Sequence, residues 1–454
     1  MKWFIGSLIK IRNFGIYASY GVDKFLIRIT NYFDFFKAKK ISKKIFFSKK
    51  KTKRDIENFS INGVWIGDLI YDSYLKKYNK PTIDLNSKSF LSFFSKCIEN
   101  FLFWEKFFKK NKVQGISVSH VVYLNAIPLR IAVKKNIDVF HCVDSRIYKI
   151  DKNSCSFKKK TNGYDYHFKL YRKIFKSFPK MIKNKSLNKG KKFIKKIISG
   201  DEKYFYFPNK KIIKSKKNYF LNNKKKKIVI FAHSFFDSPH VYGNFLFPDF
   251  YEWLKFCVKI AKKTNFDWYI KPHPNYDDNS EKLLNDFLNQ NPVFKIIDKD
   301  APVNDLVKQG MFAVLTVYGS CGSELPLLGV KVVNADRNNP HAKYNFCFNP
   351  KSLKEFENTV LNLDKKKLKF NYDELYEFHY MNQFYFHSNL LFENIGEKFL
   401  KEKNRQIMYS DKIYDYWLKS FTKKKHLRII NSIRYFHNEK DHHLSLKHTR
   451  KYDL

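Results

Sequence analysis

The strongest constraint on the fold is a regular alternation of strand-like and helix-like segments between residues 225 and 362. Short apolar runs rich in β-branched and aromatic residues predict strands, and a segment with helical periodicity follows each of them. Strands that alternate with helices pair in parallel, so the alternation predicts a doubly wound parallel sheet. The five predicted strands are "KKIVIFAHSFF", "FDWYIKPHP", "FKIID", "FAVLTVYG" and "VKVVNAD".

The clearest of the predicted helices is "DFYEWLKFCVKIAKKT", residues 249–264. Its apolar residues recur at intervals of three and four, which places them on one face that packs against a core. The predicted inward set is Phe250, Trp253, Leu254, Cys257, Val258 and Ala261. Four further segments have helical character: "SEKLLNDFLNQN", "PVNDLVKQG", "SCGSELPLLG" and "SLKEFENTVLNL".

An earlier stretch, residues 112–146, repeats the alternation on a smaller scale. "GISVSHVVYL" predicts a short buried strand, "AIPLRIAVKKN" a helix and "IDVFHCVD" a second strand, which together form a βαβ unit. The expected fold class is therefore α/β, with two Rossmann-like domains whose parallel sheets face a cleft. The expected parts are a basic amphipathic N-terminal segment (1–54), an N-terminal α/β domain with a lysine-rich linker of irregular helices (55–223), a C-terminal Rossmann-like domain (224–400) and a basic C-terminal extension (401–454).

The formal net charge of +46 lies mainly outside the second α/β region. Residues 1–60 carry fifteen Lys and Arg against four Asp and Glu, whereas residues 228–330 carry nine against twelve, a net charge of −3. This acidic balance argues against a nucleic-acid-binding protein, which would need basic and aromatic residues on one continuous face. Two interpretations of the lysines remain open, a solvated surface or attraction to anionic lipid headgroups. An interfacial helix would suit the apolar residues near the N-terminus: Trp3, Phe4, Ile5, Leu8 and Ile9.

The cysteines and the apolar runs of the sequence indicate in which cellular compartment the protein lies. The six cysteines form no C-x-x-C pair, which argues against a disulfide framework or a zinc site and fits a reducing cytoplasm. No run reaches the roughly 18 apolar residues of a membrane-spanning helix, and the first residues lack the apolar core and cleavage site of a signal peptide. We therefore expect a cytoplasmic protein, peripheral on the inner face of the cell membrane if its basic segments bind lipid.

The segment "FDWYIKPHPNYDD", residues 266–278, ends a predicted strand with two prolines. Pro272 and Pro274 cannot donate to a sheet ladder, and each holds the residue before it in an extended conformation. Lys271 and His273 should therefore point outward at the carboxyl end of the strand, where open α/β sheets bind ligands. We expect both to neutralise phosphate groups, and the alternative is an ordinary surface turn.

The segment "VYGSCGSELPLLG", residues 317–329, places a turn of small residues between a predicted strand and a helix start. Glycines let a ligand approach the backbone, and the free N–H groups of a helix start favour a phosphate. The alternative is a capped helix with Ser320 as its N-cap and Glu324 as a favourable charge in the first turn. The expected ligand contacts are Gly319, Ser320, Gly322, Ser323 and Glu324.

Two further segments offer candidate catalytic groups. The loop "FAHSFFDSPHVYGNF" should bring His233, Ser234, Asp237 and His240 to the cleft. A carboxylate next to imidazoles could orient a sugar or transfer a proton, although an aspartate-capped loop before a helix would look similar. His120 follows the strand "ISVSH", where it faces the expected cleft or is a satisfied core histidine. Asp144 and Arg146 hold an equivalent position after the next strand and are weaker candidates.

Three histidines near the end of the chain, His442, His443 and His448, raise the question of a metal. Without a carboxylate or cysteine scaffold, histidines in a tail are usually solvated. We therefore expect no metal site and no tightly bound cofactor.

These motifs together resemble bacterial surface-polysaccharide glycosyltransferases of the GT-B fold, and most of all capsule polysaccharide biosynthesis proteins. The resemblance rests on "SH…Y" with "PLRIA", on "HSFFDSPHVYGNFLFPDFYEWL", on "KPHP", and on "YGSCGSELPLLG" followed by "VKVVNA". The His-Pro pair and the Ser/Gly turn also resemble those of bacterial sialyltransferases, Kdo transferases and teichoic-acid glycerophosphotransferases. The matched segments are residues 112–146 and 228–362.

The resemblance implies a nucleotide donor, CMP-linked or of another nucleotide, held by the C-terminal Rossmann-like domain. It implies His273, Ser320, Ser323 and Glu324 as donor contacts and His120 as the cleft histidine of the first domain. We expect a metal-independent glycosyltransferase that acts on a surface-polysaccharide or lipid-linked glycan acceptor. The alternatives are a glycerophosphotransferase or nucleotide-sugar epimerase of similar fold and, from another class, a basic protein that binds membranes or nucleic acid.

Overall fold

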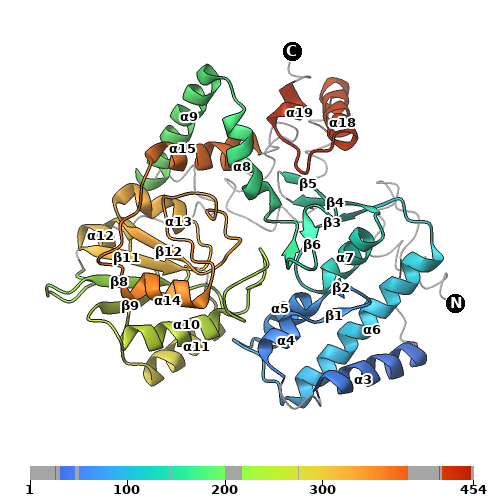
Figure 1. Ribbon diagram of the computed structural model, residues 1–454, viewed down its shortest axis with the longest axis horizontal. Helices are drawn as coiled ribbons and strands as arrows, with labels where there is room; N and C mark the ends of the chain where they lie inside the picture. The colour runs from blue at the N-terminus through green and yellow to red at the C-terminus, as the bar shows by residue number, and fades with distance from the viewer. Residues whose placement is uncertain are drawn as a thin grey trace. The chain divides into compact units, whose positions relative to one another are not determined.

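The computed structural model describes residues 26, 31–46, 51–143, 146–199, 217–274, 276–386, 419 and 422–450 (Figure 1). The chain divides into two compact units, one of residues 1–51 with 85–112 and the other of residues 52–84 with 113–454. The functional division expected from the sequence, with boundaries at residues 54, 223 and 400, stays a prediction.

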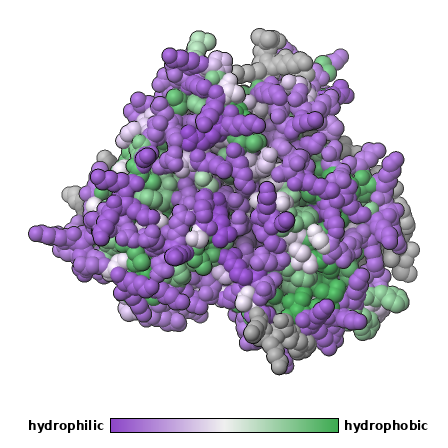
Figure 2. Space-filling model, viewed as in Figure 1, coloured by the Kyte–Doolittle hydropathy of each residue, from purple (hydrophilic) through white to green (hydrophobic). Residues whose placement is uncertain are grey.

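The smaller unit is built on two helices, α3 (Tyr32–Phe46) and α6 (Lys88–Lys110). The buried residues of α3 are spaced four apart, from Asp34 to Phe46, and therefore lie on one face. Asp34 forms an ion pair with Lys106 of α6 at 2.6 Å, and the ring of Phe46 lies 5.5 Å, between centroids, from two phenylalanines of α6. Figure 2 shows hydrophobic residues gathered over α6.

The larger unit contains a five-stranded sheet in which every strand runs parallel to its neighbours, in the order β10-β9-β8-β11-β12. The parallel sheet predicted from residues 225–362 is thus confirmed, and each strand overlaps its predicted segment. The strands are β8 (Lys227–Phe231), β9 (Asp267–Lys271), β10 (Phe294–Ile296), β11 (Met311–Thr316) and β12 (Lys331–Asn334).

Helices follow the strands of this sheet as the alternation predicts. The predicted inward set of α10 is buried in full, and the Asp249 side chain caps the helix by accepting the Glu252 N–H at 2.8 Å. The helices are α10 (Phe250–Ala261), α11 (Asp278–Gln290), α12 (Val303–Lys308), α13 (Cys321–Glu324) with the 3-10 turn η3 (Leu325–Leu328), and α14 (Leu353–Leu361).

Apolar side chains cover both faces of the five-stranded sheet. Ile228 and Ile230 of β8 lie in a core with residues of α10, α11 and α14, whereas Val229 lies in a second core on the other face. Successive strand residues point to opposite faces, so a strand that is covered on both sides needs a continuous apolar run such as "KIVIF". The edge of this sheet where the strands end is left for the loops that carry the candidate site.

The N-terminal half of the larger unit has a smaller sheet than expected. β3 (Gly115–Val118) and β4 (Asp138–Val143) are parallel, as the predicted βαβ unit requires, but β5 (Arg146–Ile150) pairs antiparallel with β4. The sheet is therefore mixed, and a second fully parallel Rossmann sheet is not found among the described residues. The prediction of a buried strand at residues 115–124 is wrong, because β3 is an edge strand whose residues are exposed or half-buried.

Short elements surround this small sheet. At Gly67, the first residue of α5, a Cβ atom would lie 2.0 Å from the Ile56 carbonyl oxygen, so glycine lets α5 begin against α4. The elements are α4 (Lys53–Glu57), β1 (Ser60–Ile61), β2 (Val64–Trp65), α5 (Gly67–Tyr78), η1 (Leu124–Ala126), α7 (Ile127–Lys134), β6 (Cys155–Ser156) and β7 (Thr161–Asn162).

The lysine-rich stretch after residue 151 forms helices, as expected, and the two helices within residues 166–199 are packed against the rest of the larger unit. The linker expected to run up to residue 223 stays a prediction. Gly190 of α9 lies so close to α15 that a Cβ atom there would meet the Tyr376 carbonyl oxygen at 2.1 Å. Residues of α8, α9 and α15 share the second core of the five-stranded sheet. The bounds are α8 (Tyr166–Lys176), α9 (Lys180–Ser199), α15 (Tyr372–Tyr380) and the π-helical turn η4 (Met381–Tyr385).

The end of the chain forms α18 (Lys423–Asn438) and α19 (Leu446–Arg450), beside β5. The Lys149 N–H donates to the His442 carbonyl at 2.9 Å, and His443 and His448 are buried. The expectation of solvated tail histidines is therefore wrong for these two. In the part of the chain that the structure describes, no helix combines the length and the apolar character needed to cross a membrane.

Candidate functional site

The candidate site lies at the carboxyl ends of β8 and β11, the neighbouring strands where the order of the sheet reverses. The chain passes from β8 to β9 on one side and returns to β11 on the other. Ligands of open α/β sheets bind outside such a switch point, because the loops after the two strands diverge there. Here the loops are residues 232–249 and 317–320.

His233 joins these two loops. The Val317 N–H donates to Nε2 of His233 at 3.1 Å, and Oγ1 of Thr316 lies 3.0 Å from the same nitrogen. A ring nitrogen that accepts a bond from a backbone amide carries no proton, so the proton of the neutral imidazole is on Nδ1. The ring is stacked on Phe250 with 4.9 Å between centroids, which fixes the direction of Nδ1.

Burial lowers the pKa of His233 to about 3, and the charge of His273 acts in the same direction. The ring is therefore neutral at pH 7, and a group with so low a pKa is a poor general base. Its geometry favours a hydrogen-bond donor through Nδ1 over the base that the sequence left open.

Asp237 presents a carboxylate from the same loop. Its Oδ1 accepts the Tyr123 O–H at 2.8 Å and the Ser238 N–H at 3.0 Å. The residue is exposed, and its Oδ2 has no partner among the described residues. A carboxylate with one oxygen oriented and the other open can accept a proton from a hydroxyl that approaches it.

Tyr123, the partner of Asp237, comes from the N-terminal half of the larger unit. Its φ of 59° and ψ of −176° are rare for a residue other than glycine, and such strain is concentrated at functional sites. Lys76 lies on this tyrosine, with its Nζ 3.2 Å from the hydroxyl and 4.5 Å from the ring centroid. Burial, followed by the charge of Asp237, raises the pKa of Tyr123, which therefore keeps its proton and stays a donor.

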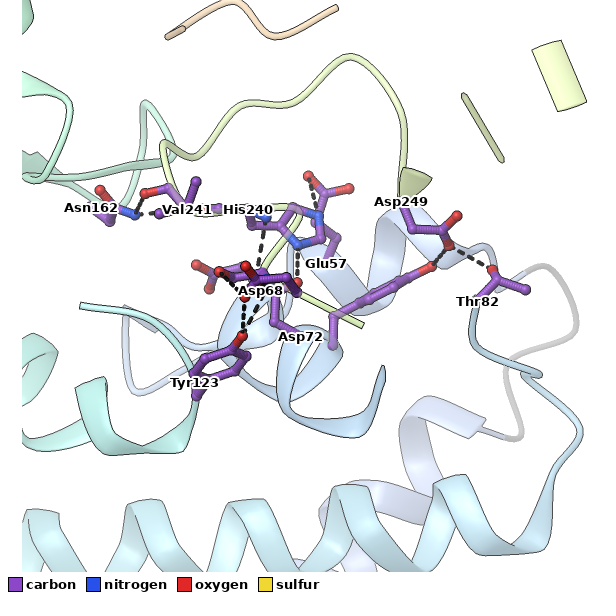
Figure 3. Close-up of polar contacts among 12 residues, drawn as sticks. Glu57, Asp68, Asp72, Thr82, Tyr123, Asn162, His240, Val241 and Asp249 are labelled. Atoms are coloured by element: carbon purple, nitrogen blue, oxygen red, sulfur yellow. Dashed lines mark hydrogen bonds and ion pairs between the residues drawn. The ribbon is translucent and has the colours of Figure 1, made fainter. Parts of the chain in front are cut away.

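A buried charged cluster, Glu57, Asp72 and His240, fastens the 232–249 loop to α5. Nδ1 of His240 lies 2.5 Å from Oδ1 of Asp72, and Nε2 lies 3.7 Å from Oε1 of Glu57 (Figure 3). All three residues are at most 4% exposed. Burial opposes a charge on the ring, but the two carboxylates outweigh it and raise the pKa of His240 well above its ordinary value. The cluster is thus an imidazolium held between carboxylates.

A second set of bonds holds the end of the same loop. Oδ2 of Asp249 accepts the hydroxyls of Tyr71 at 2.5 Å and Thr82 at 2.6 Å, while its Oδ1 caps α10 (Figure 3). Lys53 of α4 forms an ion pair with Glu252 at 2.8 Å. Residues 53–82 and residues after 230, all of the larger unit, therefore build the site together.

The two residues of the "KPHP" motif differ in position. Lys271 is buried, and its Nζ donates to the Lys299 carbonyl, so the expectation that it points outward is wrong. His273 is half-buried in the loop after β9, near enough to influence His233. The same loop contacts the loop after β8 through Tyr276, whose hydroxyl donates to the His233 carbonyl at 2.7 Å.

The small-residue turn of residues 317–324 is packed more tightly than a ligand-binding loop requires. At Gly322 a Cβ atom would lie 2.5 Å from Nδ1 of the buried His341, so this glycine makes room for a side chain of the protein. The Ser323 hydroxyl donates to the Ser320 carbonyl at 3.1 Å and is buried. A helix of four residues, such as α13, also has only a small dipole.

Of the three other expected contacts in the turn, Ser320 is exposed, whereas Gly319 and Glu324 are half-buried. Ser320 is exposed and starts α13 without a side-chain capping bond, so the N-cap reading of its hydroxyl is wrong. Gly319 has its N–H 3.3 Å from Oγ1 of Thr316. Burial raises the pKa of Glu324, although a hydrogen bond from the Ser320 side chain acts against this shift.

His120 and Arg146 are not brought to His233 and Asp237 by any contact among the described residues. His120 is exposed beyond the end of β3, and its Nδ1 lies 2.6 Å from the Ser119 carbonyl. The Arg146 guanidinium donates to the Asn382 carbonyl at 2.9 Å. Asp144 lies outside the described residues.

Sequence reasoning missed the residues of the N-terminal half that contact the 232–249 loop. Asp68 and Asp72 stand four apart in the otherwise apolar start of α5, so both point to the same side of the helix. Two carboxylates on the buried face of a helix need buried partners, and this was the available signal. The partners are Arg130 for Asp68, at 2.5 Å, and His240 for Asp72.

Among the described residues, no group of three or more His, Cys, Asp or Glu side chains could hold a metal ion. Asp68 with its partner, and the Glu57–Asp72–His240 cluster, are ion pairs within the protein.

No family model matches the sequence, and no curated protein matches it. Two solved structures are similar to the described fold. The Thermosulfurimonas dismutans KpsC β-Kdo 2,4-transferase matches with a TM-score of 0.38 and 13% identity over 58% of this chain and 78% of that chain. The UDP-GlcNAc 2-epimerase from Neisseria meningitidis, bound to UDP-GlcNAc, matches with a TM-score of 0.27 and 17% identity over 63% of this chain and 76% of that chain. Kdo transferases are among the families that the sequence motifs resemble, and a nucleotide-sugar epimerase is one of the alternatives stated with that resemblance.

Proposed function

We propose that this protein is a glycosyltransferase that moves a sugar from a nucleotide donor to a glycan acceptor. The observation that supports this proposal is the Asp237 carboxylate at the switch point of the sheet, with Oδ1 held by Tyr123 and Oδ2 open. Transfer of a sugar to a hydroxyl needs one group to take the proton of that hydroxyl and others to stabilise the departing phosphate.

In the proposed reaction, Asp237 is the base. The acceptor hydroxyl gives its proton to Oδ2 as its oxygen forms a bond to the anomeric carbon, and the bond from that carbon to the nucleotide's phosphate oxygen breaks. The Nδ1–H of His233 is directed by the bond between Nε2 and the Val317 N–H, so it is a fixed donor in the crevice. A fixed donor stabilises developing charge without reorganising during the reaction.

The donor nucleotide would occupy the crevice between the loops after β8, β9 and β11. His273 would face its phosphates, and Gly319, Ser320 and Glu324 would contact its phosphate or ribose. Lys271, Gly322 and Ser323 are weaker candidates for contacts with the donor. The polar groups of Lys271 and Ser323 bond within the protein, and Gly322 packs against His341. His120 stays a candidate for the acceptor side.

Nucleotide-sugar epimerases and glycerophosphotransferases remain rivals, because the same crevice would serve either reaction. The products separate the three activities. An epimerase yields an isomeric nucleotide sugar without an acceptor, a glycerophosphotransferase releases CMP and adds phosphorus to the acceptor, and a glycosyltransferase adds a sugar without phosphorus.

We further propose that α3 holds the protein on an anionic membrane surface, on the inner face of the cell membrane. The face of α3 opposite its buried stripe exposes Phe33 at 84% and Phe36 at 64%, together with Lys37, Lys40 and Lys44. Exposed aromatic residues next to lysines suit the boundary between lipid headgroups and acyl chains. Sedimentation with vesicles that contain anionic lipid should fall in Phe33→Ser/Phe36→Ser, and equal sedimentation of both proteins would contradict this part of the proposal.

The first test of the transferase proposal is a thermal-shift screen of the full chain against CMP, CDP, UDP, GDP and dTDP. A nucleotide present at 100 times its Kd raises the stability by about 2.7 kcal/mol, because it binds only the folded state. The variant His273→Ala should lose the response. Asp237→Asn should keep it, since Asp237 is assigned to the acceptor hydroxyl.

The matched control is Asp286→Asn, which removes an exposed carboxylate of α11. It should keep both the nucleotide response and any transfer activity. Transfer activity that survives Asp237→Asn at its full rate would remove Asp237 from the proposed role, and the absence of a response to every nucleotide would overturn the assignment of the crevice.

A further inference from the structure

A cavity of about 130 Å³ lies beyond the carboxyl end of β12, outside the crevice described above. Its wall is formed by the loop that follows β12, by the first turns of α8 and by Lys351. Tyr242 separates it from the crevice, since the Asn338 amide donates to the Tyr242 carbonyl at 3.0 Å while the Tyr242 ring lies 5.1 Å from that of Tyr318.

The charged residues of the cavity are mostly cations. The lining contains Lys169, Arg337, Lys343 and Lys351 against one acid, Asp165. Lys169 forms an ion pair with Asp165, so that charge is balanced. Within the described residues, the other three cations have no ion pair, which leaves three positive charges around one small cavity.

Two hydrogen bonds fix the side chain of Arg337 in the wall of the cavity. Its Nε donates to the Lys351 carbonyl at 2.7 Å and its Nη1 to Oδ1 of Asn244 at 2.8 Å. These two bonds fix the plane of the guanidinium, and Nη2 has no hydrogen-bond partner among the described residues. A guanidinium with a fixed plane and a free edge suits the oxygens of phosphate.

The neighbouring acids form no ion pair with these cations among the described residues. Asp336 adjoins the cavity, but burial raises its pKa to about 8, so it is neutral at pH 7. Glu355 accepts the backbone N–H of Lys351 at 2.7 Å and forms no ion pair with its ammonium group. Burial and repulsion by the charge of Lys343 lower the pKa of Lys351, while the nearby Glu355 carboxylate acts against this shift. An anion in the cavity would relieve that repulsion.

We propose that this cavity binds a phosphate group, with Arg337, Lys343 and Lys351 as its ligands. Because the cavity adjoins the crevice across Tyr242, the phosphate is one carried by the acceptor, such as a phosphorylated glycan or a lipid phosphate. The identity of the acceptor rests on the proposed transferase function, whereas the binding of phosphate does not. A phosphate of the nucleotide donor is the other group that could occupy the cavity.

The test is calorimetric titration of the full chain with inorganic phosphate at constant ionic strength. The double variant Lys343→Ala/Lys351→Ala should raise the apparent Kd for phosphate by at least about tenfold, because each charged hydrogen bond is worth a factor of that order. Both lysines are exposed, so the fold should not depend on them. The control, Lys354→Ala/Lys365→Ala, removes two exposed lysines outside the lining and should leave the Kd within twofold.

A second titration with phosphate is made in the presence of the nucleotide that stabilises the protein. Unchanged phosphate binding supports a separate site for the acceptor, whereas displacement of phosphate by the nucleotide overturns the acceptor assignment. Equal phosphate affinity of the wild type and the Lys343→Ala/Lys351→Ala variant, or no binding to either, overturns the site itself. Phosphate binding without any nucleotide response would instead count against the transferase proposal and leave the cavity as a phosphate site.

Discussion

Replacing Asp336 with asparagine should stabilise the protein at alkaline pH and change little at acidic pH. Asp336 is fully buried two residues after β12. Its Oδ1 accepts the Asn338 N–H at 2.6 Å, and its Oδ2 has no hydrogen-bond partner among the described residues. Burial raises the pKa of this carboxyl from 3.8 to about 8. The side chain is thus a neutral acid at pH 7, which asparagine matches in shape and charge.

The magnitude follows from the difference in pKa between the two states. Between pH 4 and 8 the unfolded carboxyl is ionised while the folded one keeps its proton, so the folded state binds more protons and the free energy of unfolding falls as the pH rises. Each unit of pKa difference corresponds to about 1.4 kcal/mol. From pH 5 to 8 the wild type therefore loses about 4 kcal/mol through this group, and Asp336→Asn does not.

The assay is urea unfolding, followed by tryptophan fluorescence, at pH 5 and at pH 8.5. Comparing each variant with the wild type at the same pH cancels the other titrating groups. The control Asp286→Asn, an exposed acid, should have the same small effect at both pH values. If Asp336→Asn changes the free energy of unfolding by an equal amount at pH 5 and pH 8.5, the buried carboxyl is not neutral in the fold and the reasoning is wrong.

Three further predictions concern the site and its support. His240→Gln leaves buried carboxylates without their cation and should lower the free energy of unfolding by about 3–5 kcal/mol, measured by urea unfolding at pH 6. Gly322→Ala places a methyl group against His341 and should cost about 1–3 kcal/mol, which a lower Tm would report; an unchanged Tm would contradict the packing described. Tyr123→Phe removes one donor to Asp237 and should reduce the transfer rate while the Tm of the nucleotide complex stays unchanged; a normal rate would exclude an orienting role.

The second α/β region could be predicted because its signals are local. The interval between Phe250 and Ala261 sets the buried face of α10, and Asp249 marks its first residue. The strands β8, β9, β11 and β12 are largely buried on both faces, so their apolar runs are visible in the sequence, whereas the edge strand β10 exposes Ile296. The position of the crevice follows from the order of these elements.

The failures involve contacts between residues far apart in the chain. The residues around Lys271 do not indicate that its ammonium group donates to the carbonyl of Lys299. Likewise, the residues around Gly322 do not indicate that it packs against the ring of His341. Tail histidines are usually solvated, but His443 and His448 are buried where the end of the chain packs beside β5.

The attachment of the 232–249 loop to α5 restricts how the sequence of this chain can evolve. His240 without Asp72, or Asp249 without Tyr71, leaves a buried charge or hydroxyl unmatched, so an exchange of residues 224–386 between distant homologues would separate each residue from its partner. The sheet and residues 52–84 must therefore be inherited together.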